Sequence, residues 1–406
     1  MAVEDTLLAL SSLVAFAMLW AAGANDVANA LGTSVGSKAL TFQRAIVVGA
    51  IFELLGASLV GGGVESTIES DIISVNDFGS PRRFAIGMFA AIAATFLWVT
   101  VATIAALPVS TTHAIIGSVI GFAIAEGRGR FLQGQNIGLT AASWIVSPLL
   151  GGLIAFGIYL MLKHLVLKPT SRLRRAELSL PYLFALNLAT DAVFVVAGGP
   201  DLLRPRTDSP EQALGQIYVP IFVGTFVVAG LAGRFWLLGW IRRHRHDNDE
   251  ELLLPLSAPD GGRTTIASRQ QQHTGDATNS YGPCEAYFAP LTVASACTVA
   301  FAHGGNDVAN ALGPLSVVIN FWRNHLDSHL SLPFWVNFLG GVAIVAGLTT
   351  YGQRVMETVG SGITRLSFSK AFAAQFGASV SILTATVLGL PISTTAVLRR
   401  PWARCH

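Results

Sequence analysis

Two long stretches of this chain contain no charged residue. Residues 84–125 form a run of 42 residues without Asp, Glu, Lys or Arg, and residues 131–162 form a second run of 32. A helix needs about 20 mostly apolar residues to cross a bilayer, so each run allows at least one crossing. Only 12% of the chain is charged, whereas soluble domains average about 25%. We therefore expect an all-α polytopic membrane protein and exclude a soluble enzyme, a disulfide scaffold and a disordered chain.

Apolar segments recur along the chain and predict about ten to twelve membrane spans. A polar stretch at 242–283 has the composition of a solvated linker and separates two groups of spans. The expected units are a first membrane half at 1–241, a hydrophilic cytoplasmic linker at 242–285, a second membrane half at 286–398 and a polar tail at 399–406. The expected spans are 6–24, 45–64, 84–106, 108–125, 139–162, 180–199, 214–241, 286–303, 332–351 and 371–390, with a half-segment from Pro391.

Basic residues predict the orientation in the membrane. Loop 163–175 contains Lys and Arg residues, and the linker begins with three arginines within residues 242–245. Both segments are expected on the cytoplasmic side, where Lys and Arg accumulate. Loop 65–80 contains acids but no Lys or Arg, and counting of spans places it on the opposite side.

Two motifs occur twice. NDVANALG at 25–32 recurs at 306–313, an offset of 281, and PVSTT at 108–112 recurs as PISTT at 391–395, an offset of 283. Two motifs at nearly one offset indicate a duplicated unit. Seven expected spans separate the starts of the two units. Because an odd number of crossings brings the chain to the other side of the membrane, the second unit has the opposite orientation to the first. This pattern predicts an inverted-repeat secondary transporter with broken helices.

The NDVANALG motifs bring amides and acids to membrane depth, where polar groups are costly and seldom idle. The amides occur in i, i+4 pairs that share a helical face, and an acid accompanies each pair. The preceding glycines are expected to unwind the helix and free backbone carbonyls. Such oxygens suit Na⁺, although an acid alone could instead carry a proton, and a plain helix cap is the simplest alternative. These residues are Asn25, Asp26, Asn29, Asn306, Asp307 and Asn310.

The PVSTT and PISTT motifs interrupt apolar segments with a proline followed by hydroxyl residues. Proline favours the first turn of a helix, so each motif is expected to start a half-helix. Free N–H groups and hydroxyls there would bind an anion without Lys or Arg, and ordinary capping is the alternative. The hydroxyl residues are Ser110, Thr111, Thr112, Ser393, Thr394 and Thr395. With the amides and acids, they predict a cation-coupled anion carrier.

Four single residues also need interpretation. Glu53 is the only charge between residues 45 and 64, so we expect a functional role. Gln375 is expected to be a polar contact of the second half. Asp191 is a lone acid in the span 180–199 and could equally lie near its end. His303 is expected at the membrane interface.

Other classes of function have less support. A net charge of +2 argues against a nucleic-acid partner. Three cysteines are too few and too scattered for a disulfide framework or a metal site. A hydrolase would need a nucleophile, a base and an orienting group, but the second motif has Ala396 where the first has His113. No enzyme activity and no cofactor are expected beyond a co-transported cation.

The motifs resemble those of the PiT-type inorganic phosphate transporter family. The segments that carry the resemblance are GANDVANALGTSVGS (23–37), PVSTTHAIIGS (108–118), GGNDVANALGPL (304–315), YGQRVMETVG (351–360) and LPISTT (390–395). The resemblance implies symport of inorganic phosphate with Na⁺ or H⁺ across a lipid bilayer. It implies that the Asn and Ser/Thr residues of both motifs bind phosphate, and from the sequence we add Gln375 as a further expected phosphate contact. Asp26, Asp307 and Glu53 would couple the cation, with Na⁺ held by Asn25, Asp26, Asn306 and Asp307.

Several expectations remain open within this resemblance. A non-transporting phosphate sensor or receptor, or an inactive truncated paralogue, is the alternative function. A homodimer is one option, and the plasma membrane is preferred over an organelle membrane. The second STT is followed by AVLRRPWARCH instead of a His and a further apolar stretch. We therefore expect a shortened C-terminus that lacks a final span and transports poorly.

Overall fold

The computed structural model describes residues 2–68, 72–78, 80–199, 210–239, 241, 282–323, 332–362 and 366–399. Within these ranges the chain consists of helices and turns, with no strand. Eight helical segments in the described part are long and apolar enough to cross a membrane. This confirms the expected all-α polytopic membrane protein. Nearly all of the expected linker and residues 400–406 of the expected tail lie outside the described residues.

The first repeat unit begins with a long helical segment that contains the first NDVANALG motif. α1 (Ala2–Asn25) leads into α2 (Val27–Gly36), and Asp26 lies at the junction with helical backbone angles. The Asp26 N–H donates to the Ala22 carbonyl oxygen at 2.7 Å. α3 (Phe42–Val60) runs back alongside. The expected unwinding at the motif is therefore not found, because the helical path continues through Asp26.

α6 (Pro81–Ile104) and α7 (Thr111–Ala125) form a hairpin, and its tip carries the first PVSTT motif. Phe122, near the end of α7, stacks on Phe78, which lies just before α6, with ring centroids 4.8 Å apart. The far end of α7 thus returns to the start of α6. With 15 residues, α7 spans about 22 Å, less than the bilayer core of about 30 Å. Residues 108–125 are therefore the returning arm of a hairpin and not the separate span that was expected.

Three further crossings connect the two repeat units. They are α8 (Gly134–Leu162), α9 (Arg172–Gly198) and α11 (Val219–Ala232). A π-helical segment follows α8 at Lys163–Leu167, and two more flank α11, at Leu214–Tyr218 before it and at Gly233–Leu237 after it. α11 packs on α9 and leaves most of its apolar surface exposed. Short helices lie in the loops, namely α4 (Gly62–Ser66), α5 (Val75–Phe78) and α10 (Pro210–Ala213).

The second repeat unit follows the same order of elements. A 3₁₀ turn (Gly282–Phe288) leads into α14 (Ala289–Asp307), α15 (Ala309–Trp322), α16 (Phe334–Gly362), α17 (Phe368–Val387) and α18 (Thr394–Arg399). α17 corresponds to α6 and α18 to the start of α7. The second PISTT motif thus lies at the turn between α17 and α18.

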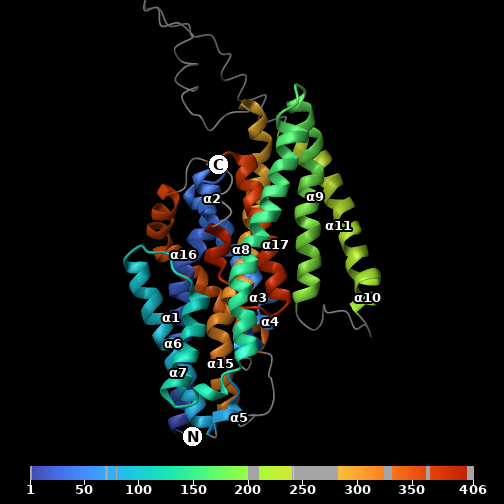
Figure 1. Cartoon of the computed structure of the whole chain (residues 1–406). Coiled ribbons are helices and arrows are strands. Elements are labelled where there is room, and N and C mark those ends of the chain that lie inside the picture. Colours follow the sequence, from blue (N-terminus) through green and yellow to red (C-terminus); the bar gives the residue numbers. More distant parts are fainter. Residues whose placement is uncertain are drawn as a thin grey trace, which may run out of the picture.

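The two units run in opposite directions. In Figure 1, α2 lies at the end of the molecule opposite the N-terminus, whereas α15 lies toward the N-terminal end. The Trp322 indole N–H, at the end of α15, donates to Asp5 Oδ1, at the start of α1, at 2.7 Å. In addition, α1 contacts α15 and α2 contacts α14. These contacts confirm the inverted repeat.

Glycines at matching positions allow the two units to pack closely. A Cβ atom on Gly23 of α1 would clash with the carbonyl oxygen of Ile344 on α16. A Cβ atom on Gly304 of α14 would clash in the same way with the carbonyl oxygen of Glu53 on α3. These glycines were expected to unwind the helix. Instead, they permit backbone-to-backbone contact between helices, which is a common use of small residues in membrane proteins.

Candidate functional site

The tips of the two hairpins supply hydroxyl groups to the centre of the bundle. Ser110 caps α7, because its Oγ accepts from the His113 N–H at 3.2 Å. Ser393 does the same for α18 with the Ala396 N–H, also at 3.2 Å. Pro108 and Pro391 thus lie in the extended tip before each helix, not in its first turn. Both serines act as N-caps, so the threonines that follow them are the groups that face the interior.

Asp26 joins the two hairpins. Thr111 of α7 donates to Asp26 Oδ2 at 2.5 Å, and Thr395 of α18 donates to Asp26 Oδ1 at 3.0 Å. All three side chains are buried. One acid of the first repeat unit is therefore bonded to hydroxyls of both units.

Asp307 lies beside a buried histidine. His303 Nε2 is 2.9 Å from Asp307 Oδ2, without the alignment of a hydrogen bond, and His303 Nδ1 is 2.9 Å from Glu53 Oε2. Thr394 approaches both Asp307 oxygens at 3.4 and 3.5 Å. The expectation that His303 lies at the interface was wrong, since the side chain is fully buried between two acids.

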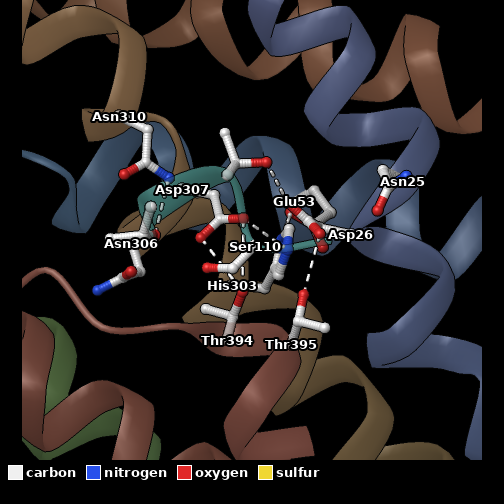
Figure 2. Close-up of polar contacts among 12 residues, drawn as sticks. Asn25, Asp26, Glu53, Ser110, His303, Asn306, Asp307, Asn310, Thr394 and Thr395 are labelled. Atoms are coloured by element: carbon white, nitrogen blue, oxygen red, sulfur yellow. Dashed lines mark hydrogen bonds and ion pairs between the residues drawn. The ribbon is translucent and has the colours of Figure 1, made fainter. Parts of the chain in front are cut away.

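These side chains form one group, shown in Figure 2, which we name the central cluster. Its members are Asp26, Glu53, Thr111, His303, Asp307, Thr394 and Thr395. Ligand atoms of Asp26, His303 and Asp307 lie within 4.8 Å of one another. Three carboxyl groups here share a single imidazole. Such a cluster requires additional positive charge, from a bound cation or from protons, because buried charges must be paired.

Asn25 fastens the first hairpin tip and lies at the margin of the central cluster (Figure 2). Its amide N–H₂ donates to Thr103 Oγ1 and to the Leu107 carbonyl, each at 3.0 Å, and its Oδ1 accepts from the Val109 N–H at 3.0 Å. Both ends of the amide thus bind the protein. Asn25 positions the tip in this conformation, and both N–H donors of its amide are used by the protein.

The equivalent amides of the second unit are only partly bonded. Asn306 donates to Thr386 Oγ1 at 3.2 Å, and Asn310 donates across the repeat to Thr112 Oγ1 at 3.2 Å. Both Oδ1 atoms are buried and have no partner among the described residues. They are oxygen acceptors beside Asp307, which suits a cation better than an anion. The side chain of Asn29 lies outside the described residues.

Gln375 lies in a separate polar contact between α17 and α2. Its Nε2 donates to Thr33 and to Ser34 Oγ, the latter at 2.7 Å, and its Oε1 accepts from Ser295 Oγ at 2.7 Å. The amide is therefore satisfied by the protein. Its position supports the packing of α2 on α17, and none of its described hydrogen bonds joins it to the central cluster.

His303 is the main site residue that sequence reasoning missed. A signal was available, since His303 precedes Asp307 by four residues and so shares its helical face. Its partner Glu53 comes from α3 of the other unit, and no local pattern joins the two. Thr103 and Thr386 were also missed, because single threonines in apolar helices carry no distinctive spacing.

Comparison with known proteins identifies the family. The profile of the phosphate transporter family matches residues 22–399. This chain belongs to the phosphate transporter family. As the fold and the family together show, it is an integral multi-pass membrane protein for phosphate transport and not an enzyme.

Individual relatives agree with the family profile. A Chlamydia pneumoniae protein that carries the name phosphate permease is 37% identical over 388 residues, which cover 95% of this chain and 86% of that protein. The chloroplastic inorganic phosphate transporter 2-1 of Arabidopsis thaliana is 35% identical, with coverage of 98% of this chain and 65% of that protein. A solved structure named as the sodium-dependent phosphate transporter superposes with a TM-score of 0.78 at 30% identity. That match covers 98% of this chain and 88% of the other.

Proposed function

We propose that this family member couples phosphate transport to cation symport at the central cluster, with Na⁺ as the cation. One observation carries the proposal: both acids of the repeated motif and the threonines of both hairpin tips meet in a single buried cluster. Asp26 is hydrogen-bonded to Thr111 of one unit and Thr395 of the other. A cation or phosphate bound there would contact both halves of the inverted repeat, as alternating access requires.

The carboxyl groups explain why a cation must accompany phosphate. Phosphate is an anion, and Asp26 and Asp307 would repel it while they are ionised. At about 4 Å, two unit charges interact by about 4 kcal/mol when the effective dielectric constant is near 20. A cation between the acids removes this repulsion. Phosphate would therefore bind only after the cation or together with it.

The hydroxyl groups link the two binding events. In the described structure Thr111 and Thr395 donate to Asp26, and Thr394 approaches Asp307. A cation bound to the carboxylates would replace these donors and free the hydroxyls to turn toward phosphate. The proposed phosphate donors are thus Thr111, Thr394 and Thr395, with Thr112, the N-caps Ser110 and Ser393, and free N–H groups of α7 nearby.

The choice of Na⁺ rests on the amide oxygens. Asn306 Oδ1 and Asn310 Oδ1 are buried and unpartnered among the described residues. A proton carried by a carboxyl group needs no such neutral oxygens, whereas Na⁺ is bound by several oxygens. The name of the matched structure, a sodium-dependent phosphate transporter, agrees with this choice. We assign Asp26, Asp307, Asn306 and Asn310 to the cation, with Glu53 acting on Asp307 through His303.

Labelled-phosphate uptake into proteoliposomes tests this function. An inward Na⁺ gradient at equal pH and an inward proton gradient in Na⁺-free choline buffer are imposed separately. We expect concentrative uptake with the Na⁺ gradient alone. Uptake driven only by the pH gradient would show that the coupling cation is H⁺ and not Na⁺. No uptake under either gradient, despite measurable phosphate binding, would contradict symport and favour a sensor.

A further inference from the structure

The two hairpin tips have the same backbone geometry. Ala106 of the first tip and Gly389 of the second occupy equivalent positions, and both have a positive φ, of 53° and 68°. The N–H groups of the next residues, Leu107 and Leu390, donate back to the last turns of α6 and α17 at the same distance of 2.8 Å. Any difference between the tips therefore comes from the residues that hold them and not from the turns themselves.

Only the first tip is held by the asparagine of its own repeat unit. The Asn25 amide donates to the Leu107 carbonyl and accepts from the Val109 N–H, in addition to its bond to α6. The equivalent Asn306 keeps the bond to its own helix, α17, where it donates to Thr386 Oγ1. Its Oδ1 is buried and has no partner among the described residues. Asn306 therefore does not bind the second tip in this conformation.

The second tip is held from outside its own unit. The indole N–H of Trp144, on α8, donates to the Pro391 carbonyl at 3.0 Å. The Thr67 hydroxyl, just after α4, donates to the Gly389 carbonyl at 2.6 Å. These two donors take the place that Asn25 has at the first tip.

Trp144 is well placed to hold the tip. Three residues further along α8, the Ser147 carbonyl accepts from the Ser381 hydroxyl of α17 at 2.7 Å. This bond fixes α8 to the first arm of the second hairpin. The indole ring of Trp144 also lies edge-on against the imidazole of His113 on α7, with ring centroids 4.0 Å apart. Trp144 thus contacts both hairpins.

We propose that Trp144 is a positioning residue that holds the second hairpin tip away from Asn306, and that the tip exchanges Trp144 for Asn306 during transport. In the second arrangement, Asn306 would bind the Leu390 carbonyl and the Ile392 N–H, as Asn25 binds the first tip. Alternating access moves one repeat against the other. A tip that changes its partners supplies such a movement while α8 and α17 stay in contact.

The exchange is coupled to the central cluster through a single oxygen, a step that rests on the proposed function. With the tip held by Trp144, Asn306 Oδ1 is available to the cation. With the tip on Asn306, the same oxygen accepts from the Ile392 N–H. Because the cation and the tip compete for this oxygen, cation binding favours the arrangement in which Trp144 holds the tip.

Trp144→Phe tests this role, since it keeps an aromatic ring beside His113 and removes the N–H donor. We expect the Na⁺ concentration for half-maximal phosphate uptake to rise about fivefold, the effect of one hydrogen bond between uncharged groups, with the maximal rate little changed. A merely structural defect would lower the maximal rate instead. Trp20→Phe is the matched control, because the Trp20 N–H donates to Thr350 Oγ1 at 2.9 Å between α1 and α16, and both quantities should stay at the wild-type value.

Fluorine NMR of the full chain labelled with fluorotryptophan observes the exchange directly. The Trp144 and Trp20 signals are assigned as those absent from Trp144→Phe and Trp20→Phe. We expect the Trp144 signal to move when Na⁺ and phosphate are removed, because the tip then leaves the indole, and the Trp20 signal to stay. Binding of labelled phosphate to the same samples reports the proposed function separately. An unmoved Trp144 signal beside intact phosphate binding would overturn the exchange and leave the proposed function standing.

Discussion

Glu53 and His303 make the two half-sites chemically different. The close contacts of Gly23 with Ile344 and of Gly304 with Glu53 give the structural equivalence of the repeat units. On this basis Ile344 stands where Glu53 would be expected, and Ala22 stands where His303 would be expected. Asp307 therefore has an imidazole nitrogen at 2.9 Å that is backed by a second acid, whereas the hydrogen bonds described for the Asp26 side chain come from hydroxyl groups. The two acids are expected to contribute unequally to cation binding.

Removing either acid should abolish coupled transport. Asp26→Asn or Asp307→Asn deletes a charge and hardly changes volume. We expect Na⁺-driven phosphate uptake to fall about 100-fold or more, since a nearby charge contributes several kcal/mol. Surface expression should stay near the wild-type level, which controls for insertion. Near-normal uptake by either variant would remove that acid from the coupling mechanism.

Glu53 and His303 should behave as a unit. Their atoms are 2.9 Å apart and both side chains are fully buried. Glu53→Gln and His303→Gln are each expected to reduce uptake at least about tenfold. The uptake rate of the double variant should be no lower than that of the less active single variant. Uptake rates of the wild-type protein and the three variants form a double-mutant cycle. Strictly additive losses would show that the two residues act independently.

The sequence could identify most of these residues but not their roles. The repeated spacing pointed to Asp26, Asp307 and the threonines, because duplicated polar groups in apolar segments are unusual. It could not show that the Asn25 amide is hydrogen-bonded to the first hairpin or that the Gln375 amide is hydrogen-bonded to α2. Those partners come from residues up to hundreds of positions away, as with Gln375 and Thr33, and only the fold brings them together.

At the level of helices, close glycine contacts hold the cation-binding helices in place. α1 packs on α16 and α14 packs on α3, with glycines at the crossing points. The same helix pairs have a second glycine contact, in which the glycine comes from the other helix. Gly56 of α3 lies against the backbone of Phe301 on α14, and Gly347 of α16 lies against the backbone of Trp20 on α1. Because backbone atoms are the neighbours, no side chain can move aside to accept a larger residue.

Alanine at these positions should therefore destabilise the protein. Gly23→Ala and Gly304→Ala would each force two helix backbones apart. We expect each to lower the free energy of unfolding by about 3 kcal/mol or more. Gly117→Ala is the control, because a Cβ atom there meets nothing within 4 Å, and alanine favours a helix. Thermal unfolding of the purified variants checks this. Equal melting temperatures for Gly23→Ala and Gly117→Ala would contradict the packing account.

Most crossings could be predicted as helices from their apolar length, but their connections could not. Residues 108–125 have the composition of a span, and apolarity alone does not tell whether a segment crosses or returns. The return of α7 depends on specific contacts, such as Phe122 with Phe78. The same holds for the glycines, where a flexible position and a close contact look alike in sequence.

At the scale of the whole molecule, the reversed repeat places matching segments at opposite ends. Figure 1 places α5 and the N-terminus at one end and the start of α9 at the other. This matches the expected separation of loop 65–80 from the basic loop 163–175. The duplication was readable in the sequence because the motifs are nearly identical, and the parity of the spans indicated the reversal even though one hairpin was counted as two crossings.

Cysteine labelling tests the reversal directly. Lys38, just after α2, and Arg323, just after α15, are both exposed. Lys38→Cys and Arg323→Cys are introduced singly into a variant without the native cysteines, and intact cells are treated with a membrane-impermeant maleimide. We expect only one of the two positions to react until the membrane is opened. Reaction of both from the same side would contradict the inverted repeat.

We propose that phosphate binds the central cluster only together with a cation. Equilibrium binding of labelled phosphate to purified protein, in NaCl and in choline chloride of equal ionic strength at constant neutral pH, measures this most directly. We predict at least about 100-fold tighter binding in Na⁺ for the wild-type protein, from the charge repulsion that the cation removes. The Asp26→Asn, Asp307→Asn double variant should show little dependence on Na⁺. Equal phosphate affinity of the wild-type protein in both salts would show that phosphate binds without Na⁺.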